Sequence, residues 1–320
     1  MRKLMPLFFN VFHCVKSRNF KFNTTLVCPV VLWFDRQKQM FTPLFFLEIF
    51  MKKITKLLIT PALALAGASF TTLSIAETCA NLPQYTELKK VLVEVSTQSE
   101  YPGGWHTPLW LVLVDSKGAV CSVVHSLDDK QKFDVSEDTQ IAHRIIAAQK
   151  ASTSNAFSSS TALSVASGNF FTAAQPGGLL QGMVYDNNQF DYLAGNTENF
   201  GTKKDPLIGK RVGGFTGAAG GLALFNAQKK KVGAIGIGGD IACTTHVLAW
   251  QVREKLGNGT YTAANVPFGL SATHDDKLIV DVVNNTSGGA GYSPSTFGHP
   301  ACRNMPEKTN PGAAISIEFH

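Results

Sequence analysis

The hydrophobic pattern of the chain is most regular in residues 209–250. Two apolar runs, at 221–225 and 232–237, flank a polar turn that contains three lysines, and this pattern predicts an antiparallel β-hairpin. Nine glycines lie between Gly213 and Gly239. Strands with so few side chains allow another backbone, a helix or a flat ligand to approach closely.

A helix is predicted directly after this hairpin. Gly238 and Gly239 end the second strand, and Asp240 can cap the helix that follows. Its apolar residues recur at helical spacing, so they are expected to face the core: Ile241, Leu248, Val252 and Leu256.

Before the hairpin, the pattern mixes helices with short strands. Residues 85–97 are amphipathic, which predicts a helix, and residues 109–114 and 119–124 predict two strands joined by a tight turn. Two further helices are predicted at 137–157 and 160–173. The longer of these is rich in alanine, and its buried face is expected to comprise Ile141, Ile145, Ala148, Ala151 and Ala156.

After Gly257 the composition shifts towards Gly, Ser, Asn and Pro, and only residues 277–283 and 313–319 resemble strands. We expect this tail, residues 257–320, to wrap around the same domain instead of forming another. Helices and antiparallel hairpins are mixed without a regular strand–helix repeat. The pattern therefore favours an α/β fold in which helices pack on an antiparallel sheet.

The N-terminal part of the chain has a different character. Ten of the 22 phenylalanines lie in residues 1–50, and no apolar run there reaches the ~20 residues that a spanning helix needs. Residues 51–76 have a basic start, an apolar stretch and a small-residue end, as a secretory signal peptide does. We expect Met51 to be the true start, with residues 1–50 an upstream extension; a real anchor segment is the alternative. The domain would then occupy residues 77–256.

Removal of these segments changes the charge of the protein. Of the 29 basic and 23 acidic residues, 10 and 2 lie in residues 1–76, so the remainder has 19 basic and 21 acidic residues. The basicity of the whole chain therefore gives no argument for a nucleic-acid partner or an anionic membrane surface. No membrane span is expected in the mature chain.

Four cysteines remain after cleavage: Cys79, Cys121, Cys243 and Cys302. An even number in an exported chain suggests two disulfides, for which three connectivities exist. A first helix packed antiparallel to the first strand would begin near the turn that follows this strand, which favours Cys79–Cys121. Cys302 would then attach the tail to Cys243.

Motifs of several common chemistries are absent from the sequence. The run from Gly236 to Ile241 follows a strand but lacks the last glycine of a dinucleotide-binding loop, and an antiparallel hairpin is the wrong context for it. There is no phosphate-binding loop and no nucleophile elbow. There is no Cys-x-x-Cys-His sequence either, so any haem would be held non-covalently.

Three segments are distinctive: WLVLVDSKGAVCSVV (110–124), RIIAAQKASTSNAF (144–157) and GGLALFNAQKKKVGAIGIGGD (220–240). They resemble the GlcG/HbpS-like family of haem-binding or "haem-degrading" domains, which shares a fold with the C-terminal domain of some corrinoid adenosyltransferases. Residues 243–250 and 297–302 look like features of an exported subgroup. The resemblance implies a profilin-like fold of α/β/α layers, a tendency to self-associate, and a link to haem or other tetrapyrroles.

The candidate ligand-binding residues are two histidines and two cations. A haem site needs an axial donor, usually His, and cations near the propionates. His246 is the candidate ligand of the haem iron, and a Cys243–Cys302 bridge would bring His299 near it. The resemblance indicates Lys150 and Arg211 as partners of an anionic carboxylate. Each residue also has a structural alternative. His246 would form a hydrogen bond to the tail, and His299 would lie in a surface loop. Lys150 would be a surface lysine, and Arg211 would form an ion pair or cap a backbone carbonyl.

We therefore expect a periplasmic or secreted binding protein for haem or a related flat anionic molecule, self-associating and without a catalytic residue that the sequence can assign. Two alternatives stay open. One is an enzyme that acts on haem or another small molecule in the same pocket. The other is a ligand-free periplasmic module that contacts a sensor or transporter.

Overall fold

The structure is a computed structural model that describes residues 78–99, 101–129, 134–183, 193–283, 291–302 and 317–319. All of them belong to one compact unit, Pro61–His320. The expected upstream extension, residues 1–50, and the expected signal peptide, residues 51–76, lie outside the described residues. Among the helices that the structure describes, none has the length and apolar character needed to cross a bilayer.

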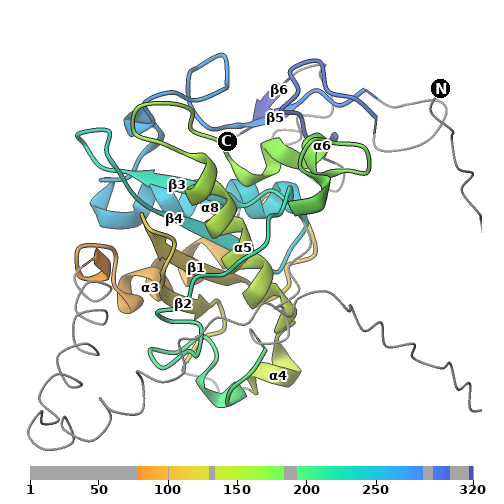
Figure 1. Ribbon diagram of the computed structural model, residues 1–320. Helices are drawn as coiled ribbons and strands as arrows, with labels where there is room; N and C mark the ends of the chain where they lie inside the picture. The colour runs from red at the N-terminus through yellow and green to blue at the C-terminus, as the bar shows by residue number, and fades with distance from the viewer. Residues whose placement is uncertain are drawn as a thin grey trace, which may run out of the picture. The chain divides into compact units, whose positions relative to one another are not determined.

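The core of the fold is a four-stranded antiparallel sheet with the order β2-β1-β4-β3 (Figure 1). Its strands are β1 (Trp110–Asp115), β2 (Val120–His125), β3 (Gly221–Phe225) and β4 (Lys231–Gly238). β1 pairs with β2 and β3 pairs with β4, so both predicted hairpins are confirmed. β1 and β4 join the two hairpins at the centre of the sheet.

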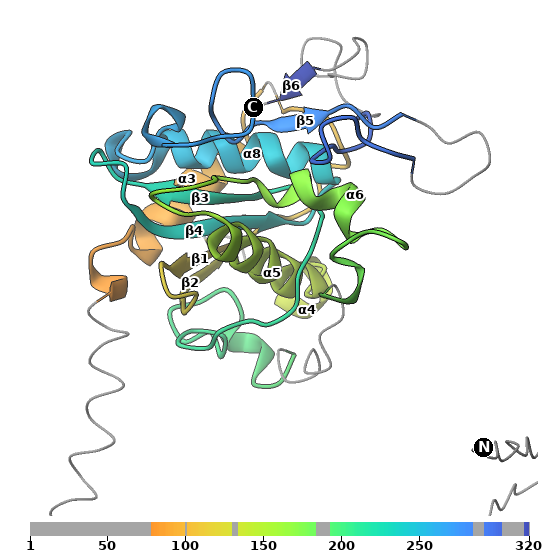
Figure 2. The same cartoon turned by 45° about the horizontal axis from the view of Figure 1, so that its top comes forward.

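Helices cover both faces of this sheet. α3 (Tyr85–Ser96) and α8 (Ala242–Lys255) pack on one face, and α5 (Ala142–Phe157) packs on the other (Figure 2). Alternate residues of β1 serve the two faces, as the pleat requires: Leu111 lies in the core under α3 and α8, whereas Val112 lies under α5. The predicted α/β fold, with helices on an antiparallel sheet, is confirmed.

The glycines of the β3–β4 hairpin allow α5 to lie close to the sheet. A Cβ atom added at Gly221, Gly236 or Gly238 would collide with carbonyl oxygens of α5, those of Lys150, Ala147 and His143 respectively. The small residues of α5 complete the fit, because Ala147, Ala148 and Ala151 are fully buried. Of the three occupants that bare strands admit, the structure therefore places a helix on this glycine face.

The predicted helix at 137–157 is wrong at its start. It is divided into α4 (Val135–Asp138) and α5, with Thr139 extended between them. Asp134 begins α4, since its side chain accepts a hydrogen bond from the Ser136 amide (2.8 Å). Ala156 is exposed and does not belong to the buried face.

The predicted helix at 160–173 is also mostly wrong. Residues 160–166 are not helical, and only Ser167–Phe170 (η1, a 3₁₀ turn) and Phe171–Ala174 (α6) are. The reason is a competing set of partners. The Ser164 amide donates to the Phe268 carbonyl (2.8 Å), and the Val165 amide donates to the Ser158 hydroxyl (3.1 Å). These bonds hold the segment extended against the C-terminal tail.

The tail covers the outer side of α8. Its strand β5 (Leu278–Val280) pairs with β6 (Ile317–Phe319), and β5 packs on α8 (Figure 2). Arg253 of α8 forms an ion pair with Asp276 (2.7 Å), and both side chains are inaccessible to solvent. α8 is consequently buried on all sides over most of its length.

Asp240 does not cap α8, which begins two residues later. Its carboxylate instead accepts hydrogen bonds from the Tyr101 hydroxyl (2.9 Å) and from the amides of Trp105 (2.9 Å) and His106 (3.0 Å). Asp240 therefore fixes the loop that leads into β1. The remaining described elements are short 3₁₀ turns at Gln181–Met183, Thr197–Asn199, Leu256–Asn258 and Ala263–Asn265.

Candidate functional site

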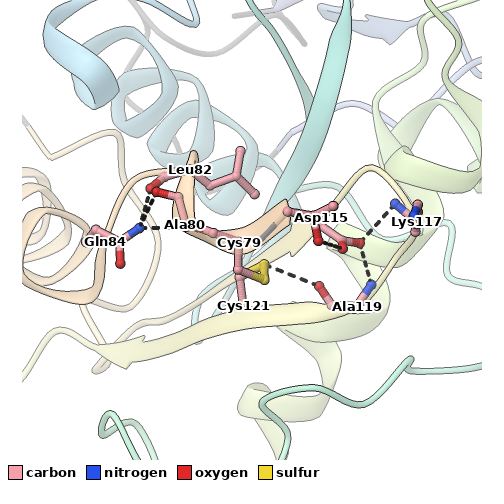
Figure 3. The surroundings of a disulfide bond; sticks show 9 residues. Cys79, Ala80, Leu82, Gln84, Asp115, Lys117, Ala119 and Cys121 are labelled. Atoms are coloured by element: carbon pink, nitrogen blue, oxygen red, sulfur yellow. Dashed lines mark hydrogen bonds between the residues drawn. A yellow bond between two sulfur atoms is a disulfide. The ribbon is translucent and has the colours of Figure 1, made fainter. Parts of the chain in front are cut away.

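The disulfides of the structure are Cys79–Cys121 and Cys243–Cys302, the two pairs favoured from the sequence. Cys79–Cys121 joins the segment before α3 to β2, and its Cα atoms are 5.4 Å apart (Figure 3). Beside it, the Asp115 carboxylate accepts hydrogen bonds from the Lys117 amide (2.9 Å) and the Ala119 amide (2.8 Å), which closes the β1–β2 turn (Figure 3). This disulfide is a structural link at the edge of the sheet.

His299 lies beside the other disulfide. Its Nδ1 atom is 2.8 Å from the Pro300 carbonyl oxygen and 3.9 Å from the sulfur of Cys243. Its backbone amide donates to the Ile279 carbonyl (2.7 Å), which attaches this segment to β5. Burial lowers the pKa of His299 to about 4, so the ring is neutral at pH 7.

His246 and Lys150 are buried near the same end of the sheet. His246 lies on α8 with no exposed surface, its ring 6.4 Å from that of Trp250. The Lys150 amine donates to the Ile237 carbonyl (2.8 Å) and to the Thr245 hydroxyl (3.0 Å), one residue before His246. The structural alternative for Lys150, a surface lysine, is wrong, because Lys150 is only 3% exposed. Burial lowers its pKa to about 7.

Arg211 does not join these residues. Its Nε donates to the Lys117 carbonyl (3.0 Å) in the β1–β2 turn. That turn follows Asp115, which pairs with Gly233, whereas Ile237 pairs with Leu111 near the other end of β1. The exposed Arg211 side chain thus caps a backbone carbonyl, one of the two structural roles considered for it, and the four predicted ligand residues do not form one site.

A large apolar hollow among the described residues was not predicted. This aromatic cavity has a volume of about 1000 Å³. Its wall combines rings and aliphatic side chains from α5, the α6 region and the tail, namely Phe157, Leu163, Phe170, Leu179, Leu180, Tyr292 and Phe297. Phe157 and Phe170 have ring centroids 4.7 Å apart, and Phe170 and Phe297 are 6.2 Å apart. None of the described residues that line the cavity carries an ionised side chain at neutral pH.

One of the predicted histidines, His299, lies behind the wall of this cavity. His299 contacts the ring of Phe171 with centroids 5.3 Å apart, and the neighbouring Thr172 lines the cavity and donates to the Gly298 carbonyl (3.3 Å). Neither His299 nor His246 is among the lining residues. Among the described residues that line the cavity, the Tyr292 hydroxyl is the one donor of a type that ligates haem iron.

A second hollow has the opposite character. This acidic cavity, of about 810 Å³, lies beside α4 and is lined by Asp129, Asp134, Asp138 and Glu198. His125 also borders it, and burial, reinforced by the nearby Lys89 charge, lowers the pKa of His125 to about 4. Lys89 pairs with Asp129 (2.8 Å), but Asp134, Asp138 and Glu198 still leave an excess of negative charge, which disfavours an anionic ligand at this place.

Comparisons with known proteins found only distant similarities to solved structures. No family model matches the chain, and no curated protein does. Among solved structures it is similar to the Klebsiella pneumoniae protein ORFY, a member of the family DUF336, with 17% identity over 56% of this chain and 86% of that one, at a TM-score of 0.31. It is also similar to a PduOC:heme complex, with 19% identity over 55% of this chain and 94% of the other, at a TM-score of 0.33. At such identities and scores, neither similarity supports a statement about function.

The sequence contains only a weak signal of the aromatic cavity. Phenylalanines occur at 157, 170, 215 and 297, at the ends of otherwise polar or glycine-rich stretches. Phe215 packs edge-on against both Phe157 (5.3 Å) and Phe170 (5.4 Å). Large aromatic residues in loops, outside the periodic elements, indicate either a satellite core or a binding surface.

Proposed function

We propose that this protein is an exported binding protein for a flat, largely apolar small molecule of the tetrapyrrole class, such as haem, which it holds in the aromatic cavity. The observation that carries the proposal is the cavity itself, whose wall is built from Phe157, Phe170, Phe297 and aliphatic side chains. Ligand sites are usually concave and mostly apolar, with volumes of about 300–1000 Å³.

The apolar wall of the cavity suits the porphyrin plane of a haem molecule but not its propionates. The porphyrin plane can stack against phenylalanine rings, as aromatic surfaces do in offset or edge-on contact. The propionates find no cation among the described lining residues, so they would stay at the mouth in contact with water. Bound haem would supply an iron atom, and among the described lining residues the hydroxyl of Tyr292 is the group that would be able to ligate it.

The same geometry gives the predicted histidines a different role. His246 and His299 are buried and do not line the cavity, so iron ligation by either would require rearrangement of α8 or the tail. We therefore expect affinity to come chiefly from apolar contact. A metal-free porphyrin should then bind nearly as tightly as haemin.

This expectation is tested by titrating the purified protein with haemin, followed by its Soret band, and with metal-free protoporphyrin, followed by fluorescence. Phe297→Ala should weaken both ligands, by about tenfold if one ring contact of roughly 1.5 kcal/mol is lost. Phe268→Ala is the matched control, because this ring is 52% exposed and does not line the cavity. Equal binding by wild type and Phe297→Ala, or no saturable binding, would refute the proposal.

Export and self-association are further parts of the proposal. Two disulfides in the structure support an oxidising compartment. Mass spectrometry of the secreted protein should find an N-terminus after Ala76 and four oxidised cysteines. Size-exclusion chromatography with light scattering should find a mass above that of one mature chain, and a strict monomer would contradict self-association.

A further inference from the structure

Three metal-ligating side chains of different segments converge beneath the tail. The sulfur atoms of Cys243 and Cys302 and a ring nitrogen of His299 all lie within 4.8 Å of one another. Each residue is more than nine-tenths buried, with exposures of 4%, 3% and 6%. Cys243 comes from α8, whereas His299 and Cys302 come from the tail, so only the folded chain brings them together.

At present the two sulfur atoms are bonded to each other, and this bond must be broken before they can bind a metal ion. A dithiol reductant would cleave it by exchange: the dithiol becomes a disulfide, and Cys243 and Cys302 each gain one electron and one proton. The two thiols would be held in place by the surrounding fold, since Ala219, Val247, Leu278 and Val280 pack around them.

We propose that the reduced protein binds one Cu(I) ion through the thiolates of Cys243 and Cys302 and the imidazole of His299. Binding would release the two thiol protons to water. His299 would offer the lone pair of Nδ1, and the proton that Nδ1 now shares with the Pro300 carbonyl would move to Nε2.

The distances suit such a site. With metal–sulfur bonds of about 2.3 Å and metal–nitrogen bonds of about 2.0 Å, a sulfur and a nitrogen ligand lie roughly 3.5–3.7 Å apart. Nδ1 of His299 is already 3.9 Å from the sulfur of Cys243. Soft thiolates favour Cu(I), and the cluster found among the described residues has three members, one fewer than a closed structural zinc site has.

This site is separate from the aromatic cavity. It concerns a metal ion and a reduced state of the protein, and it uses none of the residues that line the cavity. Failure of porphyrin binding would therefore leave it standing, and the reverse also holds.

The experiment is a competition for Cu(I) between the protein and a coloured chelator such as bicinchoninate. The protein is treated with dithiothreitol and freed of it under nitrogen. The starting protein is the mature chain, which begins after Ala76 and so lacks Cys14 and Cys28, and it carries Cys79→Ser and Cys121→Ser to remove the other pair of thiols. We expect one Cu(I) per chain after reduction, and binding at least 100-fold weaker by the oxidised form.

The ligand set is tested by replacing His299. His299→Ala should lower the Cu(I) affinity at least tenfold, while the exposed His274→Ala should not change it. X-ray absorption at the copper edge should show two sulfur neighbours and one nitrogen, and the nitrogen should be lost in His299→Ala. If circular dichroism shows that the variant with Cys79→Ser and Cys121→Ser is unfolded, the X-ray absorption spectrum of the reduced wild-type chain tests the same ligand set. Unchanged affinity in His299→Ala, or equal binding by the oxidised protein, would overturn the proposal.

Discussion

The close contact between α5 and the glycine face of the sheet predicts a large effect of Gly236→Ala. The new methyl group would collide with two backbone atoms of α5, the carbonyl oxygen of Ala147 and the amide nitrogen of Ala151. A backbone segment inside a helix cannot turn away as a flexible side chain can. The helix and the sheet must therefore separate locally, and Ala151 and its neighbours must lose packing.

The magnitude follows from measured costs of overpacking. An extra methyl group in a well-packed interior costs about 1–3 kcal/mol, and a collision with two backbone atoms of a helix belongs at the upper end, about 3 kcal/mol. For a domain of this size, about 2–4 °C of Tm is lost per kcal/mol, so the melting temperature should fall by roughly 6–12 °C.

The assay is urea unfolding followed by circular dichroism, with both disulfides intact. Gly182→Ala is the matched control, since a Cβ atom there meets nothing within 4 Å. Its effect should stay within about 0.5 kcal/mol. If Gly236→Ala lost less than about 1 kcal/mol relative to Gly182→Ala, α5 could not lie as close to β4 as described, and the account of the glycine face would be refuted.

Two further predictions concern buried charges. The Lys150 amine has a pKa of about 7 in the folded protein, against 10.5 for an ordinary lysine exposed to water. Between these two pH values the unfolded chain binds more protons than the folded one. The free energy of unfolding should therefore rise with pH in this range. Relative to Lys150→Met, the wild type should gain up to about 1 kcal/mol per pH unit in unfolding free energy between about pH 7.5 and about pH 9.5; parallel curves would contradict the burial of the amine. Asp276→Asn should cost about 3–5 kcal/mol in urea unfolding, because it leaves Arg253 as a buried charge without its carboxylate partner. The double variant Arg253→Met, Asp276→Leu should recover much of this loss. If its destabilisation equalled the sum of those of Arg253→Met and Asp276→Leu alone, the two side chains would not be coupled.

The predictions that succeeded depend on short-range patterns. Each hairpin is formed by two apolar runs separated by a few turn residues, so its strands meet with little loss of chain entropy and pair as their sequence suggests. The helix at Tyr85–Ser96 could be predicted equally well, because its buried residues Leu88, Leu92 and Val95 recur at helical spacing. The disulfide Cys79–Cys121 followed from the direction of that helix relative to the first strand.

The failures depend on partners that are distant in sequence. Residues 160–166 have a helix-compatible composition, but Ser164 bonds to Phe268 about a hundred residues later. For Lys150, on its alanine-rich helix, a surface position was one of the two alternatives. The lysine is buried because the end of β4 and the start of α8 offer it two acceptors, Ile237 and Thr245.

By itself, the sequence determined that this protein has two β-hairpins, helices that pack on them, and a strip of glycines able to admit a close neighbour. Only the tertiary structure decided that the neighbour is α5, that Arg211 lies apart from His246 and His299, and that an aromatic cavity forms between α6 and the tail. The reason is physical. Backbone hydrogen bonding and periodic apolar faces depend on residues that are close together in the sequence. A cavity or a ligand cluster is formed by segments that are distant in sequence, and these come together only when all the layers of the fold pack.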